Sequence, residues 1–296
     1  ILDRAMSLKR DTGDLIELEE FLSEHVVSSK ITEEVHKDPE ELKRLRSQNL
    51  LISYAESFVD QHFCSEIREI GEPVRAVIWK CAGIQCDDFS KLHIGKWVRF
   101  FNPKNITIVT GEYPVYFAGH RSVNFIDGRA RVVIFAPIDF ASGAKVFTHL
   151  HIMDNPNISH LEQGRILIPS IIYPDCSIGE DTHIFGSLAL KTVLADVSVT
   201  SYRKSFPPYS IIGGIGRTLR VIKYLDFPEL FPPKHIADLM EKAKKFFPSL
   251  GRLLQDYYKI IEEIIETKGD RMENWSLLVK EVKKIEKKYL GYYRND

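Results

Sequence analysis

A large aliphatic or aromatic residue recurs at every sixth position in the middle of this 296-residue chain. Small residues stand four positions after the first three members of the main series, at Ser170, Cys176 and Thr182. This spacing does not fit an ordinary hairpin sheet, whose side chains alternate with a period of two between turns that recur about every 8–12 residues. The main series consists of Ile166, Ile172, Ile178, Ile184 and Leu190.

The same period is present upstream, in a run made of Ile134, Phe140 and Val146. The two runs differ in phase, because the 20 residues from 146 to 166 are not a multiple of six. We therefore expect a loop to interrupt the repeat at about residues 152–165.

A hexad points two residues inward, one large and one small. Three hexads, about 18 residues, close one turn of a triangular parallel coil, and such stacked repeats bury a continuous core. The sequence therefore predicts a mainly β core built as a parallel β-helix. Irregular β-structure with a coincidental spacing is the alternative.

Charge divides the chain into three blocks. Residues 1–92 carry 12 Lys and Arg against 19 Asp and Glu, residues 93–225 carry 14 against 9, and residues 226–296 carry 14 against 13. The overall charge of -1 thus hides an acidic flank and a mildly basic, charge-poor middle. We take these blocks as an N-terminal helical region, the coil domain and a C-terminal helical region.

Both flanks have helical periodicity. In the C-terminal flank, one apolar stripe runs from Leu253 to Ile265, and a break at 267–270 separates it from a second stripe. We expect these helices to pack on the core or to form oligomer contacts. The second stripe consists of Leu278, Val282, Ile285 and Tyr289.

The cysteine content and the apolar runs of the chain indicate its cellular location. Four scattered cysteines cannot form a disulfide framework, so we expect a reduced, cytoplasmic chain. No apolar run approaches the roughly 20 residues of a membrane span, and charges interrupt the first ten residues, so neither a transmembrane segment nor a secretory signal is expected. Nothing in the charge pattern predicts a nucleic-acid partner.

Three segments give the middle block a family resemblance. They are "ILIPSIIYPDCSIGEDTHIFGSLAL" at 166–190, "KSFPPYSIIGG" at 204–214 and "RVIKY" at 220–224. From about residue 93 to 224 the chain resembles the hexapeptide-repeat acyltransferases, and most of all their sugar, polysaccharide and xenobiotic O-acetyltransferases. The resemblance implies a left-handed parallel β-helix, a homotrimer and acetyl-CoA as co-substrate, with a sugar, glycan or small hydroxylated acceptor.

The family has a catalytic histidine at the end of a coil, just before an interrupting loop. The segment at 134–151 ends in that place, and an ungapped alignment puts His151 on the catalytic position, with His149 as the fallback. A positioned imidazole can take the proton of an acceptor hydroxyl as it attacks a thioester, and its pKa near 6.5 suits that task.

The second ring nitrogen of the base needs a partner that fixes the tautomer, and Asp154 and Glu162 are nearby candidates. We also expect His149 and His151 to point to opposite faces of an extended chain, which leaves one of them for a structural role.

The resemblance also implies where the substrates bind. The acetyl-CoA phosphates meet basic residues near the end of the coil, here Arg203, Lys204, Arg217, Arg220 and Lys223. Polar residues ahead of the catalytic coil meet the acceptor, here Asn124 and Asp127.

The chain departs from the family pattern in two places. Asp196 occupies a position expected to hold a large apolar residue, and "IGRTL" at 215–219 replaces a shorter segment after the Gly-Gly pair. Asp196 therefore interrupts the predicted core, and the longer segment leaves open which of the basic residues contacts the phosphates.

Two other functions are alternatives to acetyl transfer. A trimeric β-helix could act as a non-catalytic scaffold with helical binding flanks, which the length of the flanks favours. A zinc enzyme with three histidine ligands would need a ligand pair separated by four residues, and His149, His151 and His160 lack that spacing, so no metal is expected.

Overall fold

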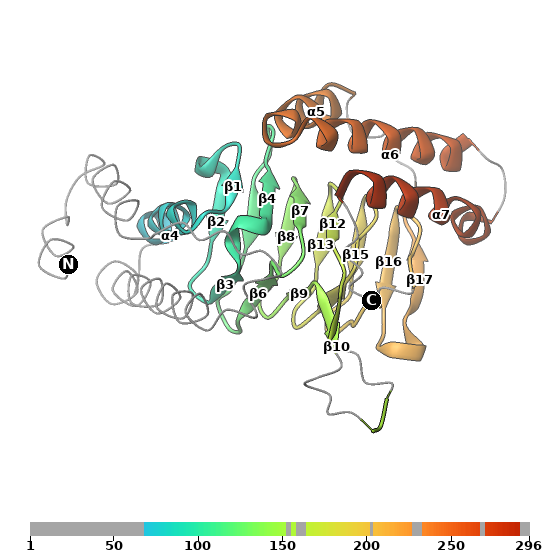
Figure 1. The fold of residues 1–296 in the computed structure, drawn as a ribbon, viewed down its shortest axis with the longest axis horizontal. Coiled ribbons are helices and arrows are strands. Elements are labelled where there is room, and N and C mark those ends of the chain that lie inside the picture. The colour runs from blue at the N-terminus through green and yellow to red at the C-terminus, as the bar shows by residue number, and fades with distance from the viewer. Residues whose placement is uncertain are drawn as a thin grey trace, which may run out of the picture.

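A computed structural model of the chain describes residues 68–151, 155–157, 164–201, 204–226, 233–266 and 270–290. Most of the predicted N-terminal helical region, residues 1–67, lies outside these ranges. Its described part begins with helix α4 (Arg68–Ala82), which packs against β2 at the N-terminal end of the sheets (Figure 1).

The core is mainly β and its sheets are mostly parallel. Sheet 1 contains β1 (Gln85–Cys86), β4 (Ile106–Val109), β7 (Val132–Phe135) and β12 (Ser170–Ile172). Sheet 2 contains β2 (Leu92–Ile94), β5 (Val115–Phe117), β8 (Ile138–Phe140), β13 (Cys176–Ile178), β15 (Thr192–Leu194), β16 (Ser210–Gly213) and β17 (Arg220–Tyr224). Sheet 3 contains β3 (Val98–Phe101), β6 (Asn124–Asp127), β9 (Lys145–Phe147) and β14 (His183–Phe185).

From β1 to β14, apart from the inserted segment, the chain visits the three sheets in rotation and each turn adds one strand to each sheet. After β14 only sheet 2 gains strands, and isolated bridges at Leu188 and Val199 continue sheets 1 and 3. The two hexad runs, out of phase along the sequence, are stacked in register in space. The inserted segment between them therefore leaves the coil without disturbing its core. The stacked pairs are Ile134 with Ile172, Phe140 with Ile178, and Val146 with Ile184.

The predicted hexad positions line the interior with three exceptions. Ile172, Ile178 and Ile184 are at most 1% exposed and belong to the interior, whereas Ile166 is half-buried in β11 (Arg165–Leu167), outside the coil. Leu190 is buried in a second core on the outer side of sheet 1, and Leu188 pairs with Ile172 in its place. At the far end, Leu194 pairs with Ile178 and is buried. The turn is thus shorter than three regular hexads.

Asp196 is therefore not in the core, and the prediction that it interrupts the apolar series is wrong. Its side chain is exposed and accepts a hydrogen bond from the backbone N–H of Glu180 at 2.8 Å. The coil also begins upstream of residue 93, because β1 already pairs with β4.

Two strand pairs run antiparallel. β10 (His149–His151) pairs with β11 on either side of the predicted loop, of which the structure describes only 155–157 and 164. β16 and β17 form a hairpin at the other end of the coil. Three short 3₁₀ turns complete the coil, at η2 (Phe89–Lys91), η3 (Pro103–Asn105) and η4 (Gly216–Thr218).

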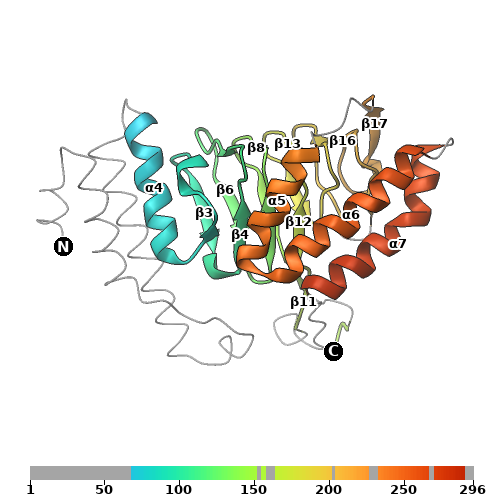
Figure 2. The same cartoon turned by 90° about the horizontal axis from the view of Figure 1, so that it is seen from above.

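Three helices cover the outer face of sheet 1 (Figure 2). They are α5 (Pro233–Phe246), α6 (Pro248–Glu266) and α7 (Arg271–Leu290), and the break predicted at 267–270 separates the last two. Outward residues of β4, β7 and β12 form a second core with these helices. The C-terminal flank is therefore a helical layer on the coil.

Tyr257 of α6 joins the helical layer to the coil. Its ring stacks on Tyr173 at a centroid distance of 3.6 Å, and its hydroxyl oxygen accepts a hydrogen bond from the backbone N–H of Leu190 at 2.9 Å. Both tyrosines are at most 1% exposed. A buried N–H that loses its acceptor costs about 1–3 kcal/mol.

We therefore expect Tyr257→Phe to lower the free energy of unfolding by about 1–3 kcal/mol, because Leu190 keeps a buried donor without a partner. Urea unfolding measures it. Tyr258→Phe is the matched control, since the Tyr258 hydroxyl is buried without a hydrogen-bond partner among the described residues and its removal breaks no such bond. Equal losses in the two variants would contradict the assignment.

Candidate active site

The two histidines singled out in the sequence lie on β10, directly after sheet 3. His149 and His151 begin and end this three-residue strand, which pairs with β11 so that His149 faces Leu167 and His151 faces Arg165. The histidines therefore occupy the point where the regular coil gives way to the inserted segment, as the hexad pattern predicts.

His149 is held by a buried carboxylate. Its Nδ1 lies 2.6 Å from Oδ2 of Asp127, whose side chain is completely buried, while the His149 side chain keeps 14% of its surface exposed. A carboxylate on Nδ1 fixes the tautomer that carries its proton there and leaves the lone pair on Nε2. His149 therefore has the arrangement of a general base.

The carboxylate of Asp127 is itself fixed from several sides. Its Oδ1 accepts the backbone N–H of Arg129 at 3.1 Å, and its Oδ2 lies 3.1 Å from the Arg129 guanidinium. Burial alone would raise the pKa of Asp127, but the hydrogen bond from His149 and the charge of Arg129 together lower it below its usual value. The acid therefore stays ionised beside the imidazole.

Arg129 also contacts the imidazole directly. Its NH1 lies 3.0 Å from Nδ1 and 3.2 Å from Nε2 of His149, and its guanidinium stacks over the ring of Phe101 at 4.6 Å. Thr148, the residue before His149, is joined to the preceding turn of the coil, because its hydroxyl donates to the Asp127 carbonyl at 2.7 Å. The His149 ring is thus held in one orientation, with Arg129 donating to Nε2, so an acceptor hydroxyl must displace this contact to reach Nε2.

His151 is the more exposed histidine. The expectation that the two rings point to opposite faces is wrong, because residues two apart on a strand share a face, and the ring centroids lie 5.4 Å apart. The partners predicted for the base, Asp154 and Glu162, lie outside the described residues. The buried carboxylate of Asp127 contacts His149.

The two residues predicted to meet the acceptor are buried. The Asn124 amide donates to the carbonyl of Ala141 at 3.1 Å, and its oxygen accepts the backbone N–H of Gly143 at 3.0 Å. Asn124 and Asp127 are both 0% exposed, so an acceptor contact would require these hydrogen bonds to break. The structure gives Asn124 a role within the coil and Asp127 a role in orienting His149.

Asp127 was expected at the site, but as an acceptor-binding residue and not as the partner of His149. Its position follows from the coil register, since β6 lies beside β9 and Ile126 pairs with Val146. Extending that register brings Asp127 next to the segment that carries His149. A register of parallel strands one turn apart is thus the signal that identifies the pair.

Four of the five predicted phosphate ligands are exposed at the end of the coil, and Arg203 lies outside the described residues. Lys204 reaches the backbone carbonyl of Leu219 with its Nζ, which brings it to the segment that also carries Arg217 and Arg220. Lys223 follows on β17, whose side chains are largely exposed. The structure thus gathers basic residues around the β16–β17 hairpin.

The described part of the chain contains no group of three His, Cys, Asp or Glu residues arranged to hold a metal ion. None of its helices is both long and apolar enough to span a membrane.

No family model matches the sequence, and no curated protein matches it. Solved structures do match. The hexapeptide-repeat-containing acetyltransferase VCA0836 from Vibrio cholerae O1 biovar eltor, complexed with acetyl coenzyme A, is 20% identical, with 64% of this chain and 91% of that chain covered at a TM-score of 0.45.

Two further structures are a galactoside acetyltransferase in complex with coenzyme A and a maltose O-acetyltransferase from Clostridium difficile 630. The match to the first covers 67% of this chain and 86% of that chain, at 16% identity and a TM-score of 0.47. The match to the second covers 62% of this chain and 88% of that chain, at 16% identity and a TM-score of 0.42. The solved structures that this chain matches thus include hexapeptide-repeat acetyltransferases, the family that its sequence resembles.

Proposed function

We propose that this chain is an acetyl-CoA-dependent O-acetyltransferase that acetylates a hydroxyl group of a sugar or glycan, with His149 as the general base. The winding through three sheets is, in this proposal, the left-handed β-helix of the hexapeptide-repeat family. The observation that carries the proposal is the buried Asp127–His149 pair at the point where the coil is interrupted.

The pair suits acyl transfer to a hydroxyl group. Nε2 of His149 takes the hydroxyl proton while the acceptor oxygen attacks the thioester carbonyl. The tetrahedral intermediate then collapses, the carbon–sulfur bond breaks, and the imidazolium returns its proton to the sulfur. The products are the acetyl ester and CoA. Asp127 remains ionised and stabilises the imidazolium throughout.

The basic residues of the hairpin would hold the donor phosphates. Lys204, Arg217, Arg220 and Lys223 belong to one end of the coil, and charge-assisted hydrogen bonds favour phosphate at such a cluster. Acetyl-CoA would supply the activated acyl group.

A homotrimer is part of the proposal, and the outer face of sheet 3 supports it. The rings of Phe125, Phe147 and Phe185 form a ladder across β6, β9 and β14, with centroids 6.1 Å and 5.1 Å apart. All three are half-buried. Aromatic rows of this kind are enriched in subunit contacts. Because sheet 3 ends next to β10, this contact would bring a second subunit close to His149.

Phe147→Glu is expected to convert the trimer into monomers, because it places a charge in the centre of the aromatic ladder. Light scattering coupled to size-exclusion chromatography measures the mass. Tyr116→Glu is the matched control, since Tyr116 lies on the outer face of sheet 2 and is 44% exposed. A wild-type monomer, or a Phe147→Glu variant that stays trimeric, would refute the proposed contact.

The activity is tested by measuring CoA release from acetyl-CoA over a panel of sugars, glycans and amino sugars, with mass spectrometry of the products. The proposal expects an acetyl ester on at least one hydroxylated acceptor. Products acetylated only on nitrogen would overturn the O-acetyltransferase assignment. No release with any acceptor, together with no CoA binding by calorimetry, would favour a scaffold.

A further inference from the structure

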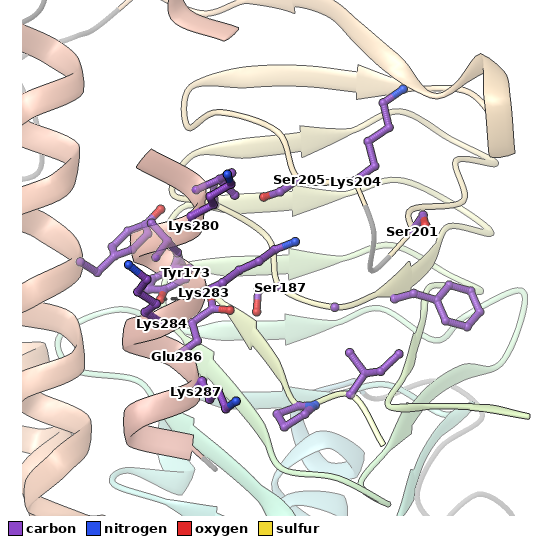
Figure 3. A pocket seen from close by; sticks show the side chains of 18 of the residues that line it. Tyr173, Ser187, Ser201, Lys204, Ser205, Lys280, Lys283, Lys284, Glu286 and Lys287 are labelled. Carbon is purple, nitrogen blue, oxygen red and sulfur yellow. Dashed lines mark hydrogen bonds between the residues drawn. The ribbon is translucent and has the colours of Figure 1, made fainter. Parts of the chain in front are cut away.

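A cavity of about 640 Å³ lies between helix α7 and the coil (Figure 3). Its coil side is formed by β11 and the residues after it, and by the segments around Ser187 and Ser205. Its volume is that of a small-molecule site, which is commonly about 300–1,000 Å³. The cavity shares Lys204 with the predicted phosphate cluster, whereas Arg217, Arg220 and Lys223 do not line it.

The floor of the cavity is aromatic. Tyr173 and Tyr257 stack there, and Trp275 is 2% exposed. The indole N–H of Trp275 is buried and has no acceptor within the part of the chain that the structure describes. A buried indole N–H usually finds a partner, so this wall offers a ligand both an apolar surface and one hydrogen-bond donor.

An acid stands where helix α7 should have an apolar residue. The buried face of α7 consists of Trp275, Val282, Glu286 and Leu290, at the spacing of a core-facing stripe. Glu286 is 6% exposed and lines the cavity, and Tyr173 donates a hydrogen bond to its Oε1 at 3.4 Å. A hydrocarbon side chain would pack here at a lower cost, since burying a carboxyl group is unfavourable.

Lysines form the rim above this floor. Lys280, Lys283 and Lys287 are exposed, line the cavity and make no ion pair with any residue whose position is described. Lys283 and Glu286 extend from α7 towards the coil, whereas Lys284 points away and pairs with Glu281 (Figure 3). The mouth therefore carries several positive charges over an apolar interior.

We propose that this cavity binds a small amphipathic organic anion, with its apolar body against Tyr173, Tyr257 and Trp275 and its acidic group among the lysines of α7. The aromatic and aliphatic lining excludes water from the body of the ligand, and the lysine amines neutralise its charge. This inference does not depend on the proposed acetyl transfer.

Octanesulfonate is a suitable probe, because it combines an apolar chain with a charge that is constant between pH 5 and 9. Calorimetry is expected to show binding to the full chain, and at least tenfold weaker binding of 1-octanol, which has the same chain without the charge. The variant Lys280→Gln/Lys283→Gln/Lys287→Gln should lose at least tenfold in affinity for the sulfonate and little for octanol.

The matched control is Lys245→Gln/Lys259→Gln/Lys288→Gln, which removes the same charge from exposed positions that do not line the cavity. Val279→Phe fills the cavity and should abolish binding of both probes without shifting the thermal unfolding transition downwards. The inference is overturned if the control triple variant weakens sulfonate binding as much as the rim triple variant does. It is also overturned if folded Val279→Phe binds as wild type does, or if neither probe binds.

Glu286 supplies a second readout. Its carboxyl faces Tyr173 and Ser187 from the coil and Lys283 from its own helix. Burial raises its pKa to about 7, so it is ionised mainly above that pH and then repels an anionic ligand. Sulfonate binding should weaken several-fold from pH 6 to pH 8 in the wild type, and Glu286→Gln should remove that dependence. An identical pH profile in both proteins would contradict the placement of the ligand next to Glu286.

Discussion

Replacing His149 with alanine is expected to slow acetyl transfer by about 10²–10⁴-fold, the usual contribution of a positioned general base. Without the imidazole, nothing accepts the hydroxyl proton at Nε2 as the oxygen attacks. Steady-state CoA release at saturating acetyl-CoA measures the loss. His149→Gln should lose a similar factor while it keeps a hydrogen-bond donor for buried Asp127, so that a loss of activity is separated from a loss of fold.

His151→Ala is the decisive comparison, because His151 lies two residues away on the same strand and is the position that the family alignment favours. We expect this variant to keep most of the activity, since the buried carboxylate of Asp127 contacts His149. Full activity in His149→Ala with a collapse in His151→Ala would return the role of base to His151. Asp127→Asn should also lose activity, because an amide no longer fixes the tautomer of His149.

The rotation of the chain through three sheets could be predicted from the hexad spacing, because an inward aliphatic every six residues is a local requirement of each turn. The pairing of Ile134 with Ile172 could not be read from spacing, since the inserted segment hides the register. The error at Asp196 has a similar origin. The turn shortens, so Leu194 takes the core position, and such a change becomes visible only when strands are stacked.

The choice of base between His149 and His151 stays a prediction for a related reason. A histidine before an interrupting loop is a sequence feature, so the sequence predicts both residues as candidates. Our choice of His149 depends on Asp127, which lies one turn earlier and contacts the His149 ring. The cavity under α7 had no sequence signal of this kind. The second apolar stripe was expected along Leu278, Val282, Ile285 and Tyr289, whereas the buried face is rotated and places Glu286 inside.

Glu286→Gln is expected to remove a pH dependence of the free energy of unfolding of about 2–3 kcal/mol between pH 5 and pH 8. The dependence arises because the pKa of Glu286 is about 7 in the folded chain and 4.5 when the side chain is fully solvated. Desolvation raises this pKa, and the contacts with Ser187 and Tyr173 only partly offset it. The folded state then binds the proton more tightly than the unfolded state. Stability from this group is therefore fully present below pH 4.5 and is lost as the pH rises through about 7.

Urea unfolding of wild type and Glu286→Gln at both pH values isolates this contribution, because all other groups cancel in the difference. The free energy of unfolding of the variant should increase relative to that of the wild type as the pH rises. Glu281→Gln is the control, since Glu281 is an exposed residue of the same helix. A difference that stays constant with pH would show that Glu286 is not held in a desolvating site. If the expected result is found, the ionised acid lowers the stability of the fold near pH 8, which an apolar residue at the same position would not do. A chain that keeps such an acid on the buried stripe of α7, beside an aromatic floor and a lysine rim, has a binding cavity there rather than an imperfectly packed core.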